Sequence, residues 1–152
     1  MVHKRLISHR GNINGKNEKF ENNPSYIREA FQEGFDVEVD LWYINDAFYL
    51  GHDGPQYILD EYDILYDNKY WKHAKNYHAL EKIIEHRWNG FWHSTDAFTF
   101  TTLGWLWAYP GVDISTDIQK SVAVLPDDMR ISIDRFGGVC SDFIGKYRTS
   151  ER

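Results

Sequence analysis

From Asp36 to Tyr43 the chain alternates strictly between aliphatic and mostly acidic residues, and this alternation constrains the fold more than any other feature. A period of two predicts a β-strand whose successive side chains point to opposite faces. One face carries Val37, Val39 and Leu41, and the other carries Asp36, Glu38, Asp40 and Trp42. The aliphatic face is suited to a core, so Glu38 and Asp40 are expected to project side by side from the opposite face.

Helix and further strand signals flank this strand. Asn23 can cap a helix that begins at Pro24 and ends at Gly34, because Asn accepts a backbone N–H and Pro fits the first turn. A second helix is predicted over 77–88, with an apolar side made of Leu80, Ile83, Ile84 and Trp88. Short strands are predicted at 2–8, 47–50, 70–75, 91–93, 121–125 and 138–140, with a hairpin over 98–109. This alternation predicts an α/β fold with a parallel sheet.

Composition narrows the classes of protein. A chain of 152 residues that is 42% hydrophobic is expected to form one domain over 1–152. A net charge of −6 argues against broad electrostatic binding to nucleic acid. Neither a signal peptide before His9 nor a membrane span is predicted, and Cys140, the only cysteine, excludes an internal disulfide. We therefore expect a cytoplasmic protein that binds a small molecule, and its oligomeric state is left open.

Four polar residues near strand ends point to chemistry. Glu38 and Asp40 have the spacing of oxygen ligands for a hard cation, although an acidic face on a solvated edge strand has the same pattern. His9 and His52 each follow a short apolar strand, close to glycines. Two histidines beside a bound cation would supply a general base and a general acid for displacement at phosphorus. Arg10 adds a fork of donors suited to phosphate oxygens.

In order along the chain, these residues form the segments His9-Arg10-Gly11, Glu21-Asn22, 34–40 and Gly51-His52-Asp53-Gly54. This set resembles the N-terminal signature of the glycerophosphodiester phosphodiesterase family, within the superfamily of phospholipase-C-like phosphodiesterases. The resemblance is close over residues 7–54 and loose over the rest. It implies a TIM-type (β/α) barrel, one divalent cation, and hydrolysis of glycerophosphodiesters or related lipid-headgroup diesters.

The resemblance also implies roles for individual residues. His9 and His52 correspond to the acid/base couple, and Glu38 and Asp40 to two ligands of the cation. Arg10 corresponds to the arginine that binds the phosphate.

A later part of the family pattern is altered in this chain. The family places a Glu-x-Lys element on a later strand, and the counterpart here is His73-Ala74-Lys75. Lys75 is expected to approach the phosphate, while His73 replaces a carboxylate ligand. Mg²⁺ or Ca²⁺ is expected in the first place, and the imidazole opens Mn²⁺ or Zn²⁺ as alternatives.

Three further residues are candidates for a supporting role. Glu21 matches a glutamate of the family, Trp42 shares the face of the acidic pair, and His93 ends a predicted strand. Ser141-Asp142 resembles the pair that ends the family's last strand. A complete barrel needs at least about 200 residues, so we expect a compact, reduced barrel with several outer helices shortened or missing.

Two other functions fit the same residues. Attack by a hydroxyl of the substrate itself would make the protein a cyclising phosphodiesterase, a lyase. A domain that keeps the motif without catalysis would bind a phosphorylated ligand. The retained pair of histidines favours an enzyme, because a binding domain needs no acid/base couple.

Overall fold

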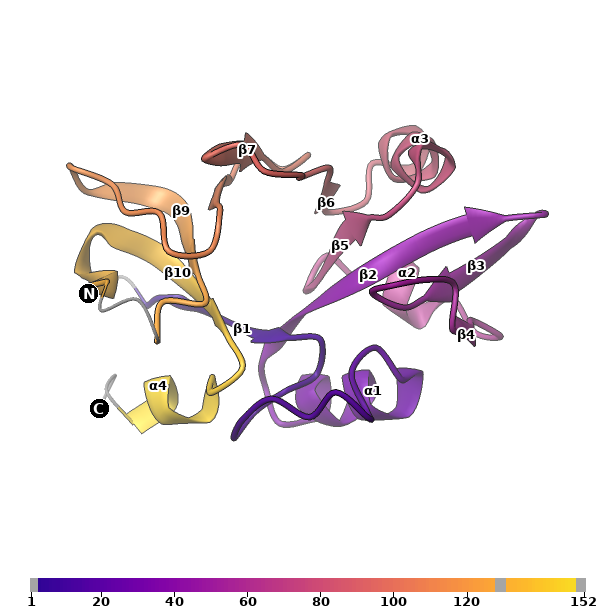
Figure 1. The fold of residues 1–152 in the computed structure, drawn as a ribbon, viewed down its shortest axis with the longest axis horizontal. Helices are drawn as coiled ribbons and strands as arrows, with labels where there is room; N and C mark the ends of the chain where they lie inside the picture. The colour runs from indigo at the N-terminus through magenta and orange to yellow at the C-terminus, as the bar shows by residue number, and fades with distance from the viewer. Residues whose placement is uncertain (1–2, 128–130, 150–152) are drawn as a thin grey trace.

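The computed structural model describes residues 3–127 and 131–149, which form a mixed α/β fold around a ten-stranded sheet (Figure 1). The helices are α1 (Pro24–Gln32), α2 (Asp63–Tyr66), α3 (Tyr77–His86) and α4 (Gly145–Thr149), with a 3-10 helix η1 at Ile133–Arg135. The strands are β1 (Arg5–His9), β2 (Asp36–Ile44), β3 (Ala47–Leu50), β4 (Tyr57–Ile58), β5 (Tyr70–Ala74), β6 (Gly90–Phe91), β7 (Phe98–Phe100), β8 (Leu106–Ala108), β9 (Ile118–Val124) and β10 (Phe136–Ser141).

Parallel strands make up the centre of the sheet. Neighbours run in the order β6, β5, β2, β1, β10, β9, β8, and each of these pairings is parallel. β7 adds to β8 as an antiparallel hairpin, and β3 and β4 extend β2 in antiparallel fashion. The sheet curves so that its two ends approach each other, with α1 and α3 outside the curve (Figure 1). The sheet and its helices confirm the α/β class. Because the strand pairings do not close the sheet, the barrel stays a prediction.

α1 forms where the sequence predicts it, with its predicted caps. The Asn23 side chain accepts a hydrogen bond from the backbone N–H of Ser25, and Pro24 occupies the first turn. Gly34 follows the helix at φ +98°, a backbone angle that favours glycine. Ile27 and Ala30 are buried and pack on the aliphatic face of β2.

α3 is shorter than predicted and exposes part of its expected apolar side. It ends at His86 because Arg87 adopts a left-handed conformation, and Trp88 packs into the core beyond the helix. Ala79 and Ile83 are the buried residues of α3, whereas Ile84 is exposed. The prediction that Ile84 faces the core is therefore wrong, since the helix turns it to the solvent side.

The second half of the sheet has few helices. β8 leads to β9 through residues 109–117 without an α-helix, and only η1 lies in the described part of the connection from β9 to β10. Buried Ile114 and Phe136, with half-buried Ile133, cover the outer side of this region instead of a helix. No helix in the described part of the chain is long and apolar enough to cross a membrane.

Large side chains fill the inner side of the curved sheet. The ring centres of Trp71 and Trp107 lie 5.6 Å apart, and those of Phe91 and Trp107 lie 4.5 Å apart. Cys140 is buried in the same cluster, and this burial raises the pKa of its thiol. Cys140 therefore packs as a small apolar side chain.

Lys72 on β5 is a fully buried cation that alternates with the inward-facing Trp71 and His73. Its ammonium group donates hydrogen bonds to the carbonyl oxygens of Asp67 and Tyr70, both at 3.0 Å. Burial lowers the pKa of Lys72 to about 7, although the negative charge of Asp67 acts in the opposite direction. The sequence does not predict this burial, because the strand over 70–75 is predicted from the residues around Lys72 and not from Lys72 itself.

Replacing Lys72 with Met is expected to flatten the pH dependence of stability. Folded Lys72 loses its proton near pH 7, whereas a lysine of the unfolded chain keeps it to about 10.5. Between these values the unfolded chain binds more protons, so stability rises with pH by at most about 1.4 kcal/mol per unit. Urea unfolding of the wild type and Lys72→Met from about pH 7 to about pH 8.5 measures this slope. Equal slopes in both proteins would contradict the prediction.

Candidate active site

The register of the central strands brings three predicted ligands together. β2 and β5 run parallel with Asp40 aligned to His73, and β1 aligns His9 with Glu38. Neighbouring strands lie about 4.8 Å apart, so aligned side chains on one face become neighbours. Each of Glu38, Asp40 and His73 offers one potential ligand atom, and these three atoms all lie within 4.8 Å of one another. We call these residues the ligand trio.

The two carboxylates of the trio are buried and each keeps an unpaired oxygen. Glu38 is 3% exposed and Asp40 is 0% exposed. Oε1 of Glu38 and Oδ1 of Asp40 have no hydrogen-bond partner. A buried charged oxygen without a partner is costly, and a bound cation would remove this cost. The donor set of two oxygens and one nitrogen therefore fits a divalent cation.

His73 is oriented for coordination by its surroundings. Its Nε2 lies 3.0 Å from the carbonyl oxygen of His93, which can only accept, so Nε2 carries the proton. The ring stacks on Phe91 at 4.9 Å between ring centres. Nδ1 then faces Oδ1 of Asp40 at 3.4 Å. A histidine ligand held by a hydrogen bond from its other nitrogen is the usual arrangement at protein metal sites.

Burial and charge move the two carboxyl pKa values apart. Burial, followed by the negative charge of Asp40, raises the pKa of Glu38 well above its ordinary value, against the opposing charge of Arg10. Burial also acts to raise the pKa of Asp40, but the His73 ring, 3.4 Å from Oδ1, and the charge of Arg10 hold it below its ordinary value. Asp40 is thus the carboxylate that stays ionised without a cation.

Arg10 is partly engaged by acidic neighbours. Its guanidinium donates to Oε1 of Glu21 at 3.2 Å, and its Nε lies 3.2 Å from Oδ2 of Asp40. Burial acts to lower the pKa of Arg10, but Asp40, Glu38 and Glu21 raise it above its ordinary value. Arg10 also lines the cavity, so it can contact a bound phosphate. Its charge balances the buried carboxylates at the same time.

Two asparagines that the sequence did not single out hold this arrangement. Asn22 donates to Oδ2 of Asp40 at 2.8 Å and accepts from the Asp40 backbone N–H at 2.9 Å. Asn12 donates to Glu21 at 2.7 Å and to Asp142 at 2.8 Å. The position of Asn22 directly after Glu21 in the recognised segment was the one signal for its role. Glu21 itself lies behind Arg10 and not among the residues that line the cavity.

His9 is oriented by Asp142, which the sequence indicates only as part of the pair after the last strand. Nδ1 of His9 donates to Oδ1 of Asp142 at 2.7 Å, and both side chains are largely buried. Burial acts to raise the pKa of Asp142, but the hydrogen bond and charge of His9 lower it. Because a carboxylate only accepts, the proton of neutral His9 sits on Nδ1 and leaves Nε2 free to accept another.

His52 is more exposed and is held by surface contacts. Its Nδ1 lies 2.7 Å from Oδ1 of Asp53, and its side chain is 45% exposed. The preceding residue, Gly51, accepts a hydrogen bond from Trp42 Nε1 at 2.7 Å. Trp42 is not among the described residues that line the cavity. It supports the loop that carries His52 instead.

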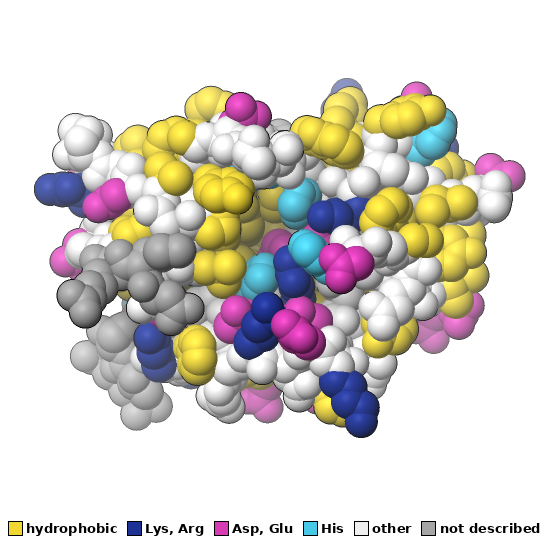
Figure 2. Space-filling view, viewed as in Figure 1, with side chains coloured by type: hydrophobic (Ala, Val, Ile, Leu, Met, Phe, Trp, Pro, Cys, Tyr) yellow, Lys and Arg dark blue, Asp and Glu magenta, His cyan; other side chains and the backbone are white. Residues whose placement is uncertain are grey.

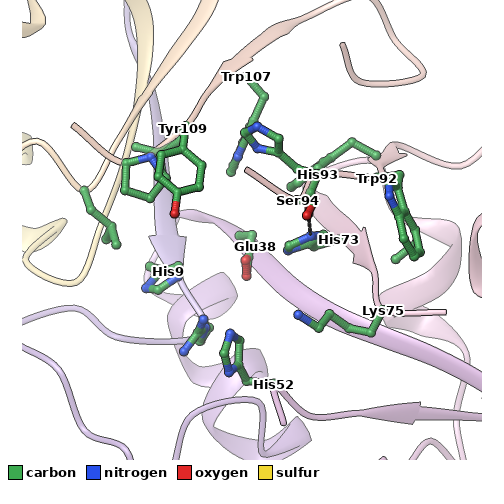
Figure 3. A pocket seen from close by; sticks show the side chains of 16 residues that line it. His9, Glu38, His52, His73, Lys75, Trp92, His93, Ser94, Trp107 and Tyr109 are labelled. Carbon is green, nitrogen blue, oxygen red and sulfur yellow. Dashed lines mark hydrogen bonds between the residues drawn. The ribbon is translucent and has the colours of Figure 1, made fainter. Parts of the chain in front are cut away.

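One cavity of about 430 Å³ lies at the carboxyl ends of the parallel strands. Seven of the predicted site residues line it: His9, Arg10, Glu38, His52, His73, Lys75 and His93. Figure 3 shows His9, Glu38, His52, His73 and Lys75 around a common space, with His93 behind His73. On the surface, histidine, basic and acidic side chains gather at the central hollow, and apolar side chains lie beside them (Figure 2). Lys75 and His93 both line this cavity, and their roles stay predictions.

No family model, curated protein or solved structure matches this chain in the comparisons.

Removing a carboxylate of the ligand trio is expected to weaken cation binding. Glu38→Gln and Asp40→Asn each remove a charged oxygen, and the affinity for Mn²⁺ should fall by at least about tenfold. Calorimetric titration with Mn²⁺ measures this change. Asp53→Asn, an exposed change outside the trio, is the matched control and should keep the wild-type affinity. Wild-type affinity in both trio variants would exclude these residues as the cation site.

Proposed function

We propose that this protein is a metal-dependent phosphodiester hydrolase of the glycerophosphodiester phosphodiesterase type. The observation that carries the proposal is a cavity lined by Glu38 and His73 of the ligand trio, with Asp40 buried next to them, and by two histidines. The Nδ1 atoms of these histidines, His9 and His52, are each paired with a carboxylate. A phosphate held between them would meet positive charge from Lys75 and Arg10. A binding domain would have no use for two histidines with this orientation.

The proposed division of labour follows from burial. His9 is buried and fixed by Asp142, so its Nε2 is suited to take a proton from the attacking water. His52 is exposed, so it is suited to give a proton to the leaving alkoxide and to regain one from solvent. Lys75 would hold a phosphate oxygen. A divalent cation bound by Glu38, Asp40 and His73 would supply a Lewis acid that neutralises phosphate charge.

The finer fold is part of the same proposal. We infer a reduced (β/α) barrel in which connections without α-helices replace outer helices, as expected for a chain of 152 residues. Support comes from hydrogen bonds across the gap between the ends of the sheet. The backbone N–H of Thr102 donates to the carbonyl oxygen of Gly90 at 2.8 Å, and the N–H of Gly90 donates to Thr102 Oγ1 at 3.0 Å.

Loss of either histidine is expected to abolish most of the turnover. His9→Ala and His52→Ala should each reduce kcat for bis(p-nitrophenyl) phosphate by about 10²- to 10⁴-fold, because a proton-transfer group is lost. His78→Ala, an exposed change on α3, is the control and should keep full activity. Full activity in both active-site variants would overturn the mechanism. Phosphorus NMR of the products distinguishes hydrolysis from the cyclising alternative.

His73 is expected to set the metal preference. An imidazole in the trio favours Mn²⁺ or Zn²⁺, whereas a third carboxylate favours Mg²⁺ or Ca²⁺. His73→Glu should therefore raise the ratio of Mg²⁺ affinity to Mn²⁺ affinity by about tenfold, as measured by calorimetry. The same ratio in wild type and variant would show that His73 does not coordinate the ion.

A further inference from the structure

One half of the cavity has no part in the proposed chemistry. Opposite the basic residues, the lining consists of large apolar side chains: Phe91, Trp92, Trp107, Tyr109, Pro110 and Leu125. Figure 3 shows Tyr109 on the side of His9 and Trp92 on the far side of His73, with Trp107 between them at the back. We call Phe91, Trp92, Trp107 and Tyr109 the aromatic wall.

The aromatic wall is a preformed surface with a buried floor and an open rim. Phe91 and Trp107 are buried, and Trp107 also contacts Trp71 in the packed interior of the sheet. Trp92 and Tyr109 at the rim are 45% and 38% exposed. Large exposed rings beside a buried apolar floor are typical of a ligand subsite, because a bound apolar group removes all of them from water.

The charges of the cavity select what the wall can bind. Arg10 and Lys75 line the cavity as cations, with four imidazoles, and Glu38 is the sole carboxylate among the described lining residues. Glu38 already belongs to the ligand trio. Arg10 is already balanced by Glu21 and Asp40. Lys75 and a cation held by the ligand trio would repel a cationic substituent, and this Coulomb repulsion would offset attraction to the rings.

The aromatic wall also offers few hydrogen-bond partners to a polar or anionic substituent. The side chains of Phe91, Trp92, Trp107 and Tyr109 offer only two indole N–H groups and one phenol hydroxyl. Burying hydroxyls or a second phosphate against such a wall would cost hydrogen bonds to water without replacing them. An uncharged apolar group loses no hydrogen bonds to water, and the burial of its surface against the wall stabilises the complex.

We propose that the aromatic wall is a subsite for an apolar substituent, aryl or hydrocarbon, on one alcohol of the phosphodiester. The inference rests on the proposed function for the position of the phosphate, between Lys75, Arg10 and the histidines. It names the substrate class of that site: diesters with one apolar alcohol, in preference to those of choline or glycerol. Trp92 and Tyr109 are the residues that determine this specificity.

Binding of simple phosphomonoesters tests the subsite without requiring turnover. Hexyl phosphate, phenyl phosphate, phosphocholine and glycerol 3-phosphate share the phosphate and differ in the substituent. In calorimetry with Mn²⁺ present, hexyl or phenyl phosphate should bind at least about tenfold more tightly than phosphocholine and glycerol 3-phosphate. The comparison of hexyl with phenyl shows whether the wall prefers a chain or a ring. Equal or tighter binding of phosphocholine or glycerol 3-phosphate would overturn the proposal.

Variants of the rim separate a specific subsite from general hydrophobic binding. Trp92→Ala should remove most of the preference for the apolar esters, and Trp92→Leu should retain part of it. Tyr77→Ala removes an exposed ring on α3, outside the cavity, and should change nothing. An unchanged preference in Trp92→Ala and in Tyr109→Ala would overturn the proposal.

Turnover distinguishes this inference from the proposed function. The kcat/KM of glycerophosphohexanol should exceed that of glycerophosphocholine in the wild type and approach it in Trp92→Ala. If the apolar monoesters bind as expected but no diester is hydrolysed with Mg²⁺, Ca²⁺, Mn²⁺ or Zn²⁺, the proposed function fails and the apolar subsite stands. If both diesters are hydrolysed equally well, the function stands and the subsite fails.

Discussion

The burial of two carboxylates on one central strand is the constraint on which the site depends. Glu38 and Asp40 are neighbouring carboxyl groups where almost no water reaches, so ionising both without a partner would destabilise the fold. Arg10, Asn22 and His73 surround Asp40 with donors and positive charge, yet one oxygen of each carboxylate stays unpaired. The protein thus stabilises the two carboxyl groups only in part, and a bound cation would supply the missing partner for their unpaired oxygens.

The arrangement of the helices explains the shape of the cavity. The described parts of the connections from β8 to β9 and from β9 to β10 contain no α-helix, and large rings on the inner side of the sheet contribute much of its buried apolar surface. Phe91 and Trp107 belong to this packed interior and also form the floor of the cavity. Phe91 further stacks on His73 and so holds a candidate ligand. The same packing therefore stabilises the sheet, orients the ligand and makes one wall apolar.

Local patterns were enough to predict most of the elements. The alternation from Asp36 to Tyr43 predicts β2 and the shared face of Glu38 and Asp40, because strand geometry depends on neighbouring residues alone. Asn23 and Gly34 bound α1 for the same reason. The ends of α3 were predicted less well, since the left-handed conformation of Arg87 has no strong local signature. The gathering of His9, His52 and the carboxylates was anticipated from the recognised segments and not from periodicity.

Tertiary structure alone decided which distant residues meet. Parallel strands pair across long stretches of sequence, so no local pattern shows that Asp142 bonds His9 from 133 positions away. Beyond Leu41, β2 pairs with β3 and no longer with β5, and there the Trp42 indole donates a hydrogen bond to Gly51 in the loop of His52. The sequence by itself determined the strand that carries Glu38 and Asp40. Only the fold determined the partners around them, because side-chain contacts between strands depend on register.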